Sequence, residues 1–293
     1  MMEHDHGRHT EKRIASAFFI NFFFTIFEVI GGLYTNSLAI LSDALHDLGD
    51  SLSLGLAWYF ERISKKGRTD DYSYGYRRFS LLGALINALV LIIGSIAILS
   101  EAIPALWSPG EADPKGMVII SVFGVIFNTI AFFKLGHSHS MNEKVVKWHL
   151  LEDVLGWVAV LIGSIVMYFT DIMFIDPLLS VLISLFIIYN VIRNLKKSLS
   201  IFLQATPEGL DVEDIENRIL AIEDIDELHD CHAWSMDGNF NIFTVHLVID
   251  GKADLKKQYD IKKKVKDAIS DLPVHHLTIE FEARDENCLQ DDL

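Results

Sequence analysis

The sequence of 293 residues is poor in cysteine and in basic residues. Its two cysteines, Cys231 and Cys288, are too few for the disulfide framework of a small secreted protein. Lys and Arg number 25 against 40 Asp and Glu, which gives a formal net charge of −15. Because phosphate binding needs a basic face, we expect no nucleic-acid partner.

Long apolar runs fill the first two thirds of the chain and thin out after about residue 200, and 51% of all residues are hydrophobic. Each run is close to the ~20 residues that cross a bilayer as a helix. The sequence therefore predicts an all-α bundle of six membrane-spanning helices in a lipid bilayer, with spans at 14–34, 37–60, 79–102, 116–136, 145–169 and 174–192.

Basic residues alternate between the two ends of these spans. Three Lys or Arg precede the first span, six lie between the second and third, and three follow directly after the sixth. Three more lie in the connection between the fourth and fifth spans or at the span ends beside it (Lys134, Lys144 and Lys147). The opposite connections hold one, Lys115. By the positive-inside rule this predicts a multi-pass protein with both termini in the cytoplasm. The short connections are typical of a bacterial inner-membrane protein.

A Pro and a Gly interrupt the chain in LQATPEGL at 203–210, where the last apolar run stops. Beyond it we expect helices at 211–222 and 254–270 and strands at 225–234, 240–249 and 274–283. This α-β-β-α-β order predicts a small cytoplasmic α+β domain. From residue 205 onward nine Lys and Arg face 22 Asp and Glu. We expect four parts: a His-containing tail 1–13, the membrane domain 14–204, the α+β domain 205–283 and a tail 284–293.

Ionisable residues inside a span are costly and usually mark a site or pathway. The second span carries four of them on one helical face, and the fifth span carries a matching pair four residues apart. The two His-x-x-x-Asp pairs supply two imidazoles and two carboxylates, a tetrahedral set that suits Zn²⁺ and disfavours Cu(I). The predicted metal ligands are His46, Asp50, His149 and Asp153.

A structural role is the alternative for polar residues in a bundle. Glu28, Asn21, Asn87 and Asn128 also lie in spans, and interhelical hydrogen bonds explain them sufficiently. Two matched pairs at the same spacing are harder to explain in that way. Asp43 and Asp47 share the face of His46 and Asp50, and we interpret them as groups that support the ligands or handle protons.

The chain resembles the cation diffusion facilitator family of zinc-type metal/proton antiporters. The resemblance extends over nearly the whole chain and rests on Asn36 to Asp50 (NSLAILSDALHDLGD), YGYRR at 74–78, GALIN at 83–87 and His149-x-x-x-Asp153. It implies that the two pairs form the transport site, that the protein is a homodimer, and that the α+β domain has a metallochaperone-like fold. Relatives with Asp in place of His46 more often prefer manganese or iron, so His46 favours zinc, with cadmium or cobalt possible.

The resemblance also implies metal binding in the cytoplasmic domain, where Zn²⁺ would be structural or regulatory. The candidate ligands are His232, His246, His276 and Glu282, and the nearby His229, His275 and Cys231 could substitute. Ordinary surface histidines are the alternative. The segment around Tyr72 and Tyr76 lacks the histidines with which some relatives bind metal, so no site is expected there. Weak metal capture is an open alternative for two His-containing segments (His4, His6, His9 and His137, His139), as is a ligand role for Cys288.

Metal binding requires neutral imidazole and ionised carboxylate, so metal and protons compete for the same groups. The sequence therefore predicts a secondary active transporter that exports divalent transition metal, foremost Zn²⁺, in exchange for protons, and not an enzyme. A membrane metallohydrolase would need an open coordination position, and the sequence has no His-Glu-x-x-His motif. A metal-gated channel or a metal-sensing membrane protein is the remaining alternative.

Overall fold

The structure is a computed structural model that describes the backbone of residues 3–64, 66–134 and 141–284. The chain divides into two units, and each is described by itself. The helical unit comprises Met1–Arg62 and Leu82–Leu195, and the sheet unit comprises Ile63–Leu81 and Lys196–Leu293.

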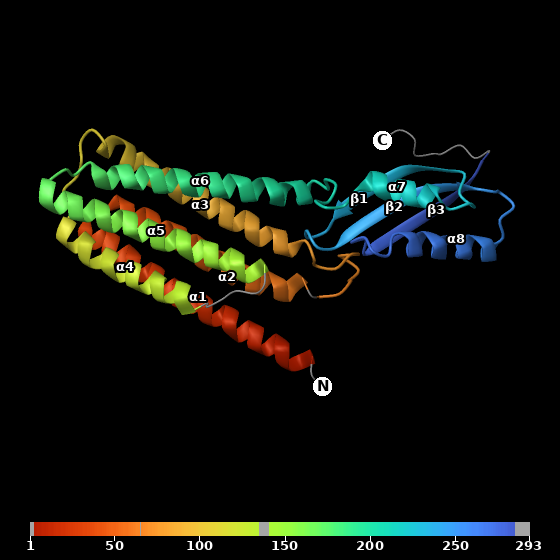
Figure 1. The fold of residues 1–293 in the computed structure, drawn as a ribbon, viewed down its shortest axis with the longest axis horizontal. Coiled ribbons are helices and arrows are strands. Elements are labelled where there is room, and N and C mark those ends of the chain that lie inside the picture. The colour runs from red at the N-terminus through yellow and green to blue at the C-terminus, as the bar shows by residue number, and fades with distance from the viewer. Residues whose placement is uncertain (1–2, 65, 135–140, 285–293) are drawn as a thin grey trace. The chain divides into compact units, whose positions relative to one another are not determined.

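Six long helices run beside one another in the helical unit, some of them continuing beyond it (Figure 1). Their ranges overlap the six predicted spans, although the first begins much earlier than predicted, so residues 3–13, expected as a tail, are helical. The helices are α1 (Glu3–Thr35), α2 (Leu38–Ser64), α3 (Phe79–Ala105), α4 (Pro114–Lys134), α5 (Met141–Thr170) and α6 (Ile175–Phe202).

Five of these helices, α1 and α3 to α6, are long and apolar enough to cross a membrane. Helix α2 is as long, but every 18-residue stretch of it contains at least three charged residues, among them Asp47 and Asp50. It nevertheless packs inside the bundle, where Gly49 lies against Leu91 of α3 and Gly94 of α3 lies against Leu45. Three of its charged residues, Asp43, Asp47 and Asp50, lie on the helical face that was expected to carry the site.

The outer surface of the bundle is apolar. Ile93, Phe133 and Phe169 are 64%, 73% and 77% exposed, together with many other large apolar side chains from all six helices. A water-facing surface rarely carries so much apolar area, whereas helices surrounded by lipid require it. The helical unit is therefore a transmembrane domain.

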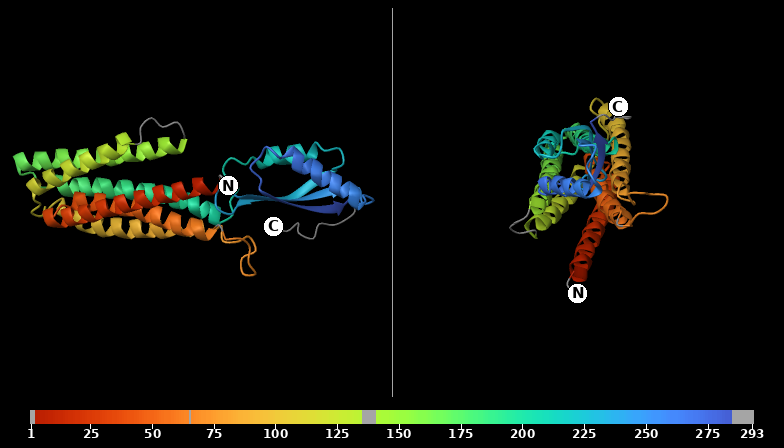
Figure 2. Two further views of the ribbon diagram at one scale, coloured as in Figure 1. Left: turned by 90° about the horizontal axis from the view of Figure 1, so that it is seen from below. Right: turned by 90° about the vertical axis from the view of Figure 1, so that its right-hand side faces the viewer.

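The sheet unit contains three strands and two further helices. Strand β2 lies in the centre, antiparallel to β1 and parallel to β3, and Figure 2 shows both helices on one face of the sheet. Ile215, Phe243 and Val265 belong to the core between the helices and that face. The α-β-β-α-β order is as predicted: α7 (Val212–Leu220), β1 (Glu227–Ser235), β2 (Asn241–Ile249), α8 (Leu255–Ala268) and β3 (His276–Ala283).

The other face of the sheet carries polar side chains. Residues alternate between faces along a strand, so His246 of β2 lies on the face opposite Phe243 and Val245. In β1 the register shifts between His229 and His232, and Asp230 within this irregularity has a φ of 49°. The shift places both histidines on the polar face.

Candidate metal centre

Four predicted ligands come together between α2 and α5. One donor atom from each of His46, Asp50, His149 and Asp153 can be chosen so that all four lie within 4.8 Å of one another. We call these residues the four-residue cluster. Its side chains are partly buried, with Asp153 only 9% exposed. The structure therefore assembles the donor set that the sequence predicted.

The contacts inside the cluster cross from one helix to the other. His149 Nε2 lies 2.9 Å from Asp50 Oδ2, and His46 Nε2 lies 3.7 Å from Asp153 Oδ1. The contacts within each helix are looser, at 3.9 Å for His46 with Asp50 and 4.0 Å for His149 with Asp153. Asp153 Oδ1 is buried without a hydrogen-bond partner in the described part of the chain. Two imidazoles and two carboxylates at this separation suit a tetrahedral divalent cation.

Helix α2 is fixed at its beginning by an acid that the sequence analysis missed. Asp176, at the start of α6, accepts hydrogen bonds from the Ser37 hydroxyl at 2.5 Å and from the backbone N–H groups of Leu38 and Ala39 at 2.8 and 3.2 Å. A carboxylate at a helix N-terminus satisfies otherwise unpaired N–H groups and interacts favourably with the helix dipole. The sequence signal that could have revealed this role was an aspartate followed by a proline at the start of a predicted span, Asp176-Pro177.

Asp43 and Asp47 lie deeper in the bundle than the cluster, at 6% and 5% exposure. Asp43 Oδ1 faces α5, at 3.5 Å from the place that a Cβ on Gly156 would occupy. The backbone carbonyl of Asp47 accepts a hydrogen bond from Asn21 of α1. Neither aspartate belongs to the four-residue cluster, although both lie on the helix that supplies two of its members.

The remaining polar residues of the spans differ in their partners. Asn21 donates to the Asp47 carbonyl and the Ser51 hydroxyl, and Asn87 donates to the Ser53 hydroxyl, so interhelical hydrogen bonds explain both, as expected. Asn128 instead donates to the Gly124 carbonyl of its own helix. Glu28 is fully buried, and neither of its carboxylate oxygens accepts a hydrogen bond from a donor group among the described residues. The expectation was wrong for Asn128, which bonds within its own helix, whereas Glu28 of α1 lies close enough to Asp47 of α2 for their carboxyl groups to share a hydrogen bond when one of them is protonated.

A second group of possible ligands lies on the polar face of the sheet. His229 Nε2 is 3.0 Å from one oxygen of Glu282, and His246 Nδ1 is 2.8 Å from the other. We call these three residues the sheet cluster, since their donor atoms also lie within 4.8 Å of one another. His246 and Glu282 were predicted ligands, whereas His229 was considered only as a substitute.

The two other predicted ligands of this domain are placed differently. His232 is half-exposed and bonds Asp230, whose second carboxylate oxygen lies 3.3 Å from His246. His276 pairs with Ile242, at the opposite end of β3 from Glu282. The structure therefore does not bring the expected set of His232, His246, His276 and Glu282 together.

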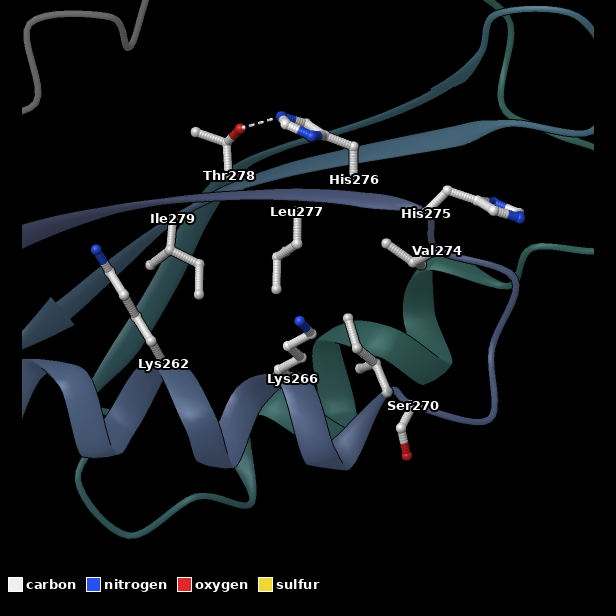
Figure 3. Close-up of a pocket in the computed structure, with 10 residues that line it drawn as sticks. Lys262, Lys266, Ser270, Val274, His275, His276, Leu277, Thr278 and Ile279 are labelled. Carbon is white, nitrogen blue, oxygen red and sulfur yellow. Dashed lines mark hydrogen bonds between the residues drawn. The ribbon is translucent and has the colours of Figure 1, made fainter.

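His276 instead borders a pocket of about 700 Å³ beside β3 and α8. Figure 3 shows His276 and Thr278 pointing to one side of β3 and Leu277 and Ile279 pointing to the other, toward α8. The His276 ring also contacts the Tyr74 ring, at 5.7 Å between centroids.

Cys231 and His275, the two other possible replacement ligands, do not join the sheet cluster either. Cys231 packs against the apolar core, and burial together with nearby Glu216 raises the pKa of its thiol to about 12. His275 accepts a hydrogen bond from the Asn241 backbone N–H. The histidines near the N-terminus, His137, His139 and Cys288 lie outside the residues whose side chains are described.

Comparison with known protein families finds a match for each of the two parts of the chain. The profile of the cation efflux transmembrane domain matches residues 14–203, and that of the cation efflux protein cytoplasmic domain matches residues 207–284. Together these matches cover most of the chain.

Relatives of known name align over most of their length. The cadmium, cobalt and zinc/H(+)-K(+) antiporter of Bacillus subtilis is 32% identical, over 98% of this chain and 94% of the relative. The metal cation efflux system protein CzcD of Cupriavidus metallidurans is 34% identical, over 95% and 89%. The zinc transporter ZitB of Escherichia coli is 31% identical, over 81% and 77%.

A solved structure of the metal-bound C-terminal domain of the CzcD transporter is 28% identical and covers 25% of this chain and 99% of that one, with a TM-score of 0.23. The relatives are named as transporters, and none of those cited is an enzyme. With both domain profiles matched in order and relatives aligned almost end to end, the chain belongs to the cation diffusion facilitator family of metal cation efflux proteins.

Proposed function

We propose that this protein exports Zn²⁺ from the cytoplasm in exchange for protons, with Cd²⁺ and Co²⁺ as further substrates. The four-residue cluster is the proposed transport site, and its His46, Asp50, His149 and Asp153 are the proposed ligands. The observation that carries the proposal is the mutual approach of their four donor atoms to within 4.8 Å across two helices of a membrane bundle.

The donor set accounts for the choice of ion. Two nitrogens and two carboxylate oxygens without a thiolate suit Zn²⁺ and disfavour Cu(I). The two carboxylates also compensate the double positive charge, which matters where the local dielectric is low. The names of the relatives support zinc, cadmium and cobalt as the substrate class.

Competition at the ligands couples metal to protons. The cluster binds metal only when both imidazoles are neutral and both carboxylates are ionised, so metal entry displaces protons and protonation displaces metal. Each proton that moves inward can draw on the membrane potential, which contributes about 2.3 kcal/mol per charge per 100 mV. Asp43 and Asp47, buried on the same helix, are proposed to support the ligands or to handle protons.

The sheet unit is proposed to sense metal in the cytoplasm as part of a homodimer. His229, His246 and Glu282 offer two nitrogens and two oxygens at separations that a cation could bridge. The positive-inside pattern supports the placement of both termini in the cytoplasm. The relatives named above are bacterial, which supports a bacterial inner membrane.

Reconstituted vesicles test the proposal. We expect saturable zinc movement that accelerates when a pH gradient of the correct sign is imposed and that moves protons the opposite way. Asp50→Ala should abolish it, whereas Glu152→Gln, an exposed acid on α5, should not. Zinc flux that ignores the pH gradient would remove the exchange, and non-saturable flux would favour a metal-gated channel instead. Metal binding without any flux would favour a sensor.

A further inference from the structure

Glu28 is a buried acid that the metal site does not use. It lies on α1, with none of its surface exposed, and neither carboxylate oxygen accepts a hydrogen bond from a donor group in the part of the chain that the structure describes. It is not a member of the four-residue cluster or of any other group of possible ligands found among the described residues. Its environment therefore has to be explained in another way.

The groups that face Glu28 are acidic. Asp43 and Asp47 of α2 interact with it electrostatically, and so does Asp153 of α5. Asp47 is also close enough for the two carboxyl groups to share a hydrogen bond when one of them is protonated. The neighbouring polar side chains are engaged elsewhere, since Thr25 donates to the Asn21 carbonyl and Asn21 donates to α2. The sequence has no Lys or Arg at 18–35, 38–60 or 148–170, the parts of α1, α2 and α5 that lie in the bundle. These helices therefore offer no Lys or Arg to compensate a charge on Glu28, and their histidines, His46 and His149, lie beside the carboxylates of the four-residue cluster.

An ionised carboxylate in such a place is costly. Burying a charge without a hydrogen bond or a counter-charge costs several kcal/mol at least, and neighbouring carboxylates add repulsion. A carboxyl group that carries its proton avoids most of this cost. A divalent cation in the four-residue cluster would change the balance, because its positive charge attracts the anionic form of every nearby acid.

We propose that Glu28 is a proton-binding residue of the exchange, which holds a proton while the four-residue cluster is without metal and releases it when a divalent cation binds there. In the release step the O–H bond breaks, the electron pair stays on the carboxylate, and the proton passes to water on the side to which the cluster is open. This inference rests on the proposed function, because it assigns one of the exchanged protons to a residue on α1, outside the ligands themselves.

Proton release on zinc binding tests the assignment directly. Purified protein in weakly buffered detergent is titrated with zinc, and the protons released per bound ion are counted with a pH indicator. We expect Glu28→Gln to release fewer protons, by up to about one per zinc ion, and the slope of log affinity against pH to fall by the same number. Glu28→Asp should restore part of the release, and Glu101→Gln, an exposed acid on α3, should leave it unchanged.

The outcomes separate the two proposals. Wild-type protein that releases no protons on binding zinc would contradict the proposed exchange itself. Wild-type release that is unchanged in Glu28→Gln would overturn the role of Glu28 and leave the exchange intact.

A measurement on unmodified protein covers the case in which Glu28→Gln does not fold. Wild-type protein grown with glutamate labelled with ¹³C at the side-chain carboxyl is compared by infrared difference spectroscopy with and without zinc. We expect a labelled carboxylic-acid band to disappear when zinc is added, because the label separates glutamate from Asp43 and Asp47. The absence of a labelled carboxylic-acid band before zinc is added would refute the proposal.

Discussion

His149 Nε2 lies 2.9 Å from Asp50 Oδ2, and this contact joins α5 to α2 at the centre of the four-residue cluster. It is shorter than either contact between residues of the same helix. The cluster therefore depends on the packing of two helices as much as on the spacing within each, and a ligand substitution should act on metal before it acts on the fold.

Removal of one ligand should abolish transport and spare folding. We expect His149→Ala to weaken zinc binding by at least about 100-fold, since even groups that only support a ligand contribute 10- to 100-fold. His149 is 38% exposed, so its loss leaves no large cavity, and the thermal unfolding of the protein in detergent should change little. Equilibrium zinc binding and vesicle transport measure the effect, with Glu152→Gln as the matched control; normal zinc binding in His149→Ala would refute the ligand role.

The sheet cluster predicts which histidines of the sheet unit bind metal. We expect His246→Ala and His229→Ala each to remove zinc from this unit, because both imidazoles approach the same Glu282 carboxylate. His276→Ala should leave the stoichiometry unchanged, since His276 lies at the far end of β3. The measurement is the number of zinc ions bound per chain, made in full-length protein that also carries Asp50→Ala, so that the transport site does not contribute. Loss of zinc in His276→Ala with retention in His229→Ala would contradict the assignment.

The buried thiol of Cys231 should be unreactive. Burial disfavours the thiolate and nearby Glu216 repels it, so its pKa rises from the usual 9.0 to about 12. At pH 9.0 an ordinary cysteine is half ionised and alkylated rapidly, whereas Cys231 remains a thiol. In a Cys288→Ala background, alkylation should therefore be slow at pH 9.0 and increase as the pH approaches 12 or when the protein is unfolded.

The control for this prediction is an exposed thiol on the opposite face of the sheet. Thr278→Cys in a chain that lacks both natural cysteines should react at the rate of a free thiol, because Thr278 is exposed on β3. Equal rates for Cys231 and this residue would show that Cys231 does not face the core, and it would again be a candidate ligand.

The parts of the site that sequence could predict are those set by periodicity within one element. His46 with Asp50 and His149 with Asp153 are each four residues apart, so each pair lies on one helical face before any packing is known. Asp176 was not predicted because its role is to bind the start of another helix, 137 to 139 residues earlier in the chain.

The sheet cluster shows a different limit. In a regular strand every second residue lies on the same face, and the irregularity around Asp230 in β1 breaks that rule. As a result both His229 and His232 lie on the polar face, and His229 rather than His232 meets Glu282. An irregularity of this kind depends on pairing with the neighbouring strand, which a single sequence does not reveal.

Close packing of α4 on α5 should control the position of Asp153. Gly124 of α4 lies against Trp157, and a Cβ at residue 124 would meet ring atoms of that tryptophan at 2.1, 2.4 and 2.5 Å. Trp157 is fully buried and lies one turn beyond Asp153, so a displacement of its ring is expected to disturb the helix that carries this ligand. We expect Gly124→Ala to cost about 1–3 kcal/mol of stability, as overpacked cores do, and to reduce transport as well.

The matched control is Gly67→Ala, because a Cβ at residue 67 meets nothing within 4 Å. Thermal unfolding in detergent, zinc affinity and vesicle transport should change in Gly124→Ala and remain as in wild type in Gly67→Ala. If Gly124→Ala lost stability with zinc affinity unchanged, α4 would support the fold without positioning Asp153. We expect a change because an overlap of this size cannot be relieved without displacing one of the two helices. If Gly124→Ala changed neither stability nor zinc affinity, the close approach of Gly124 to Trp157 would not be a determinant of this bundle.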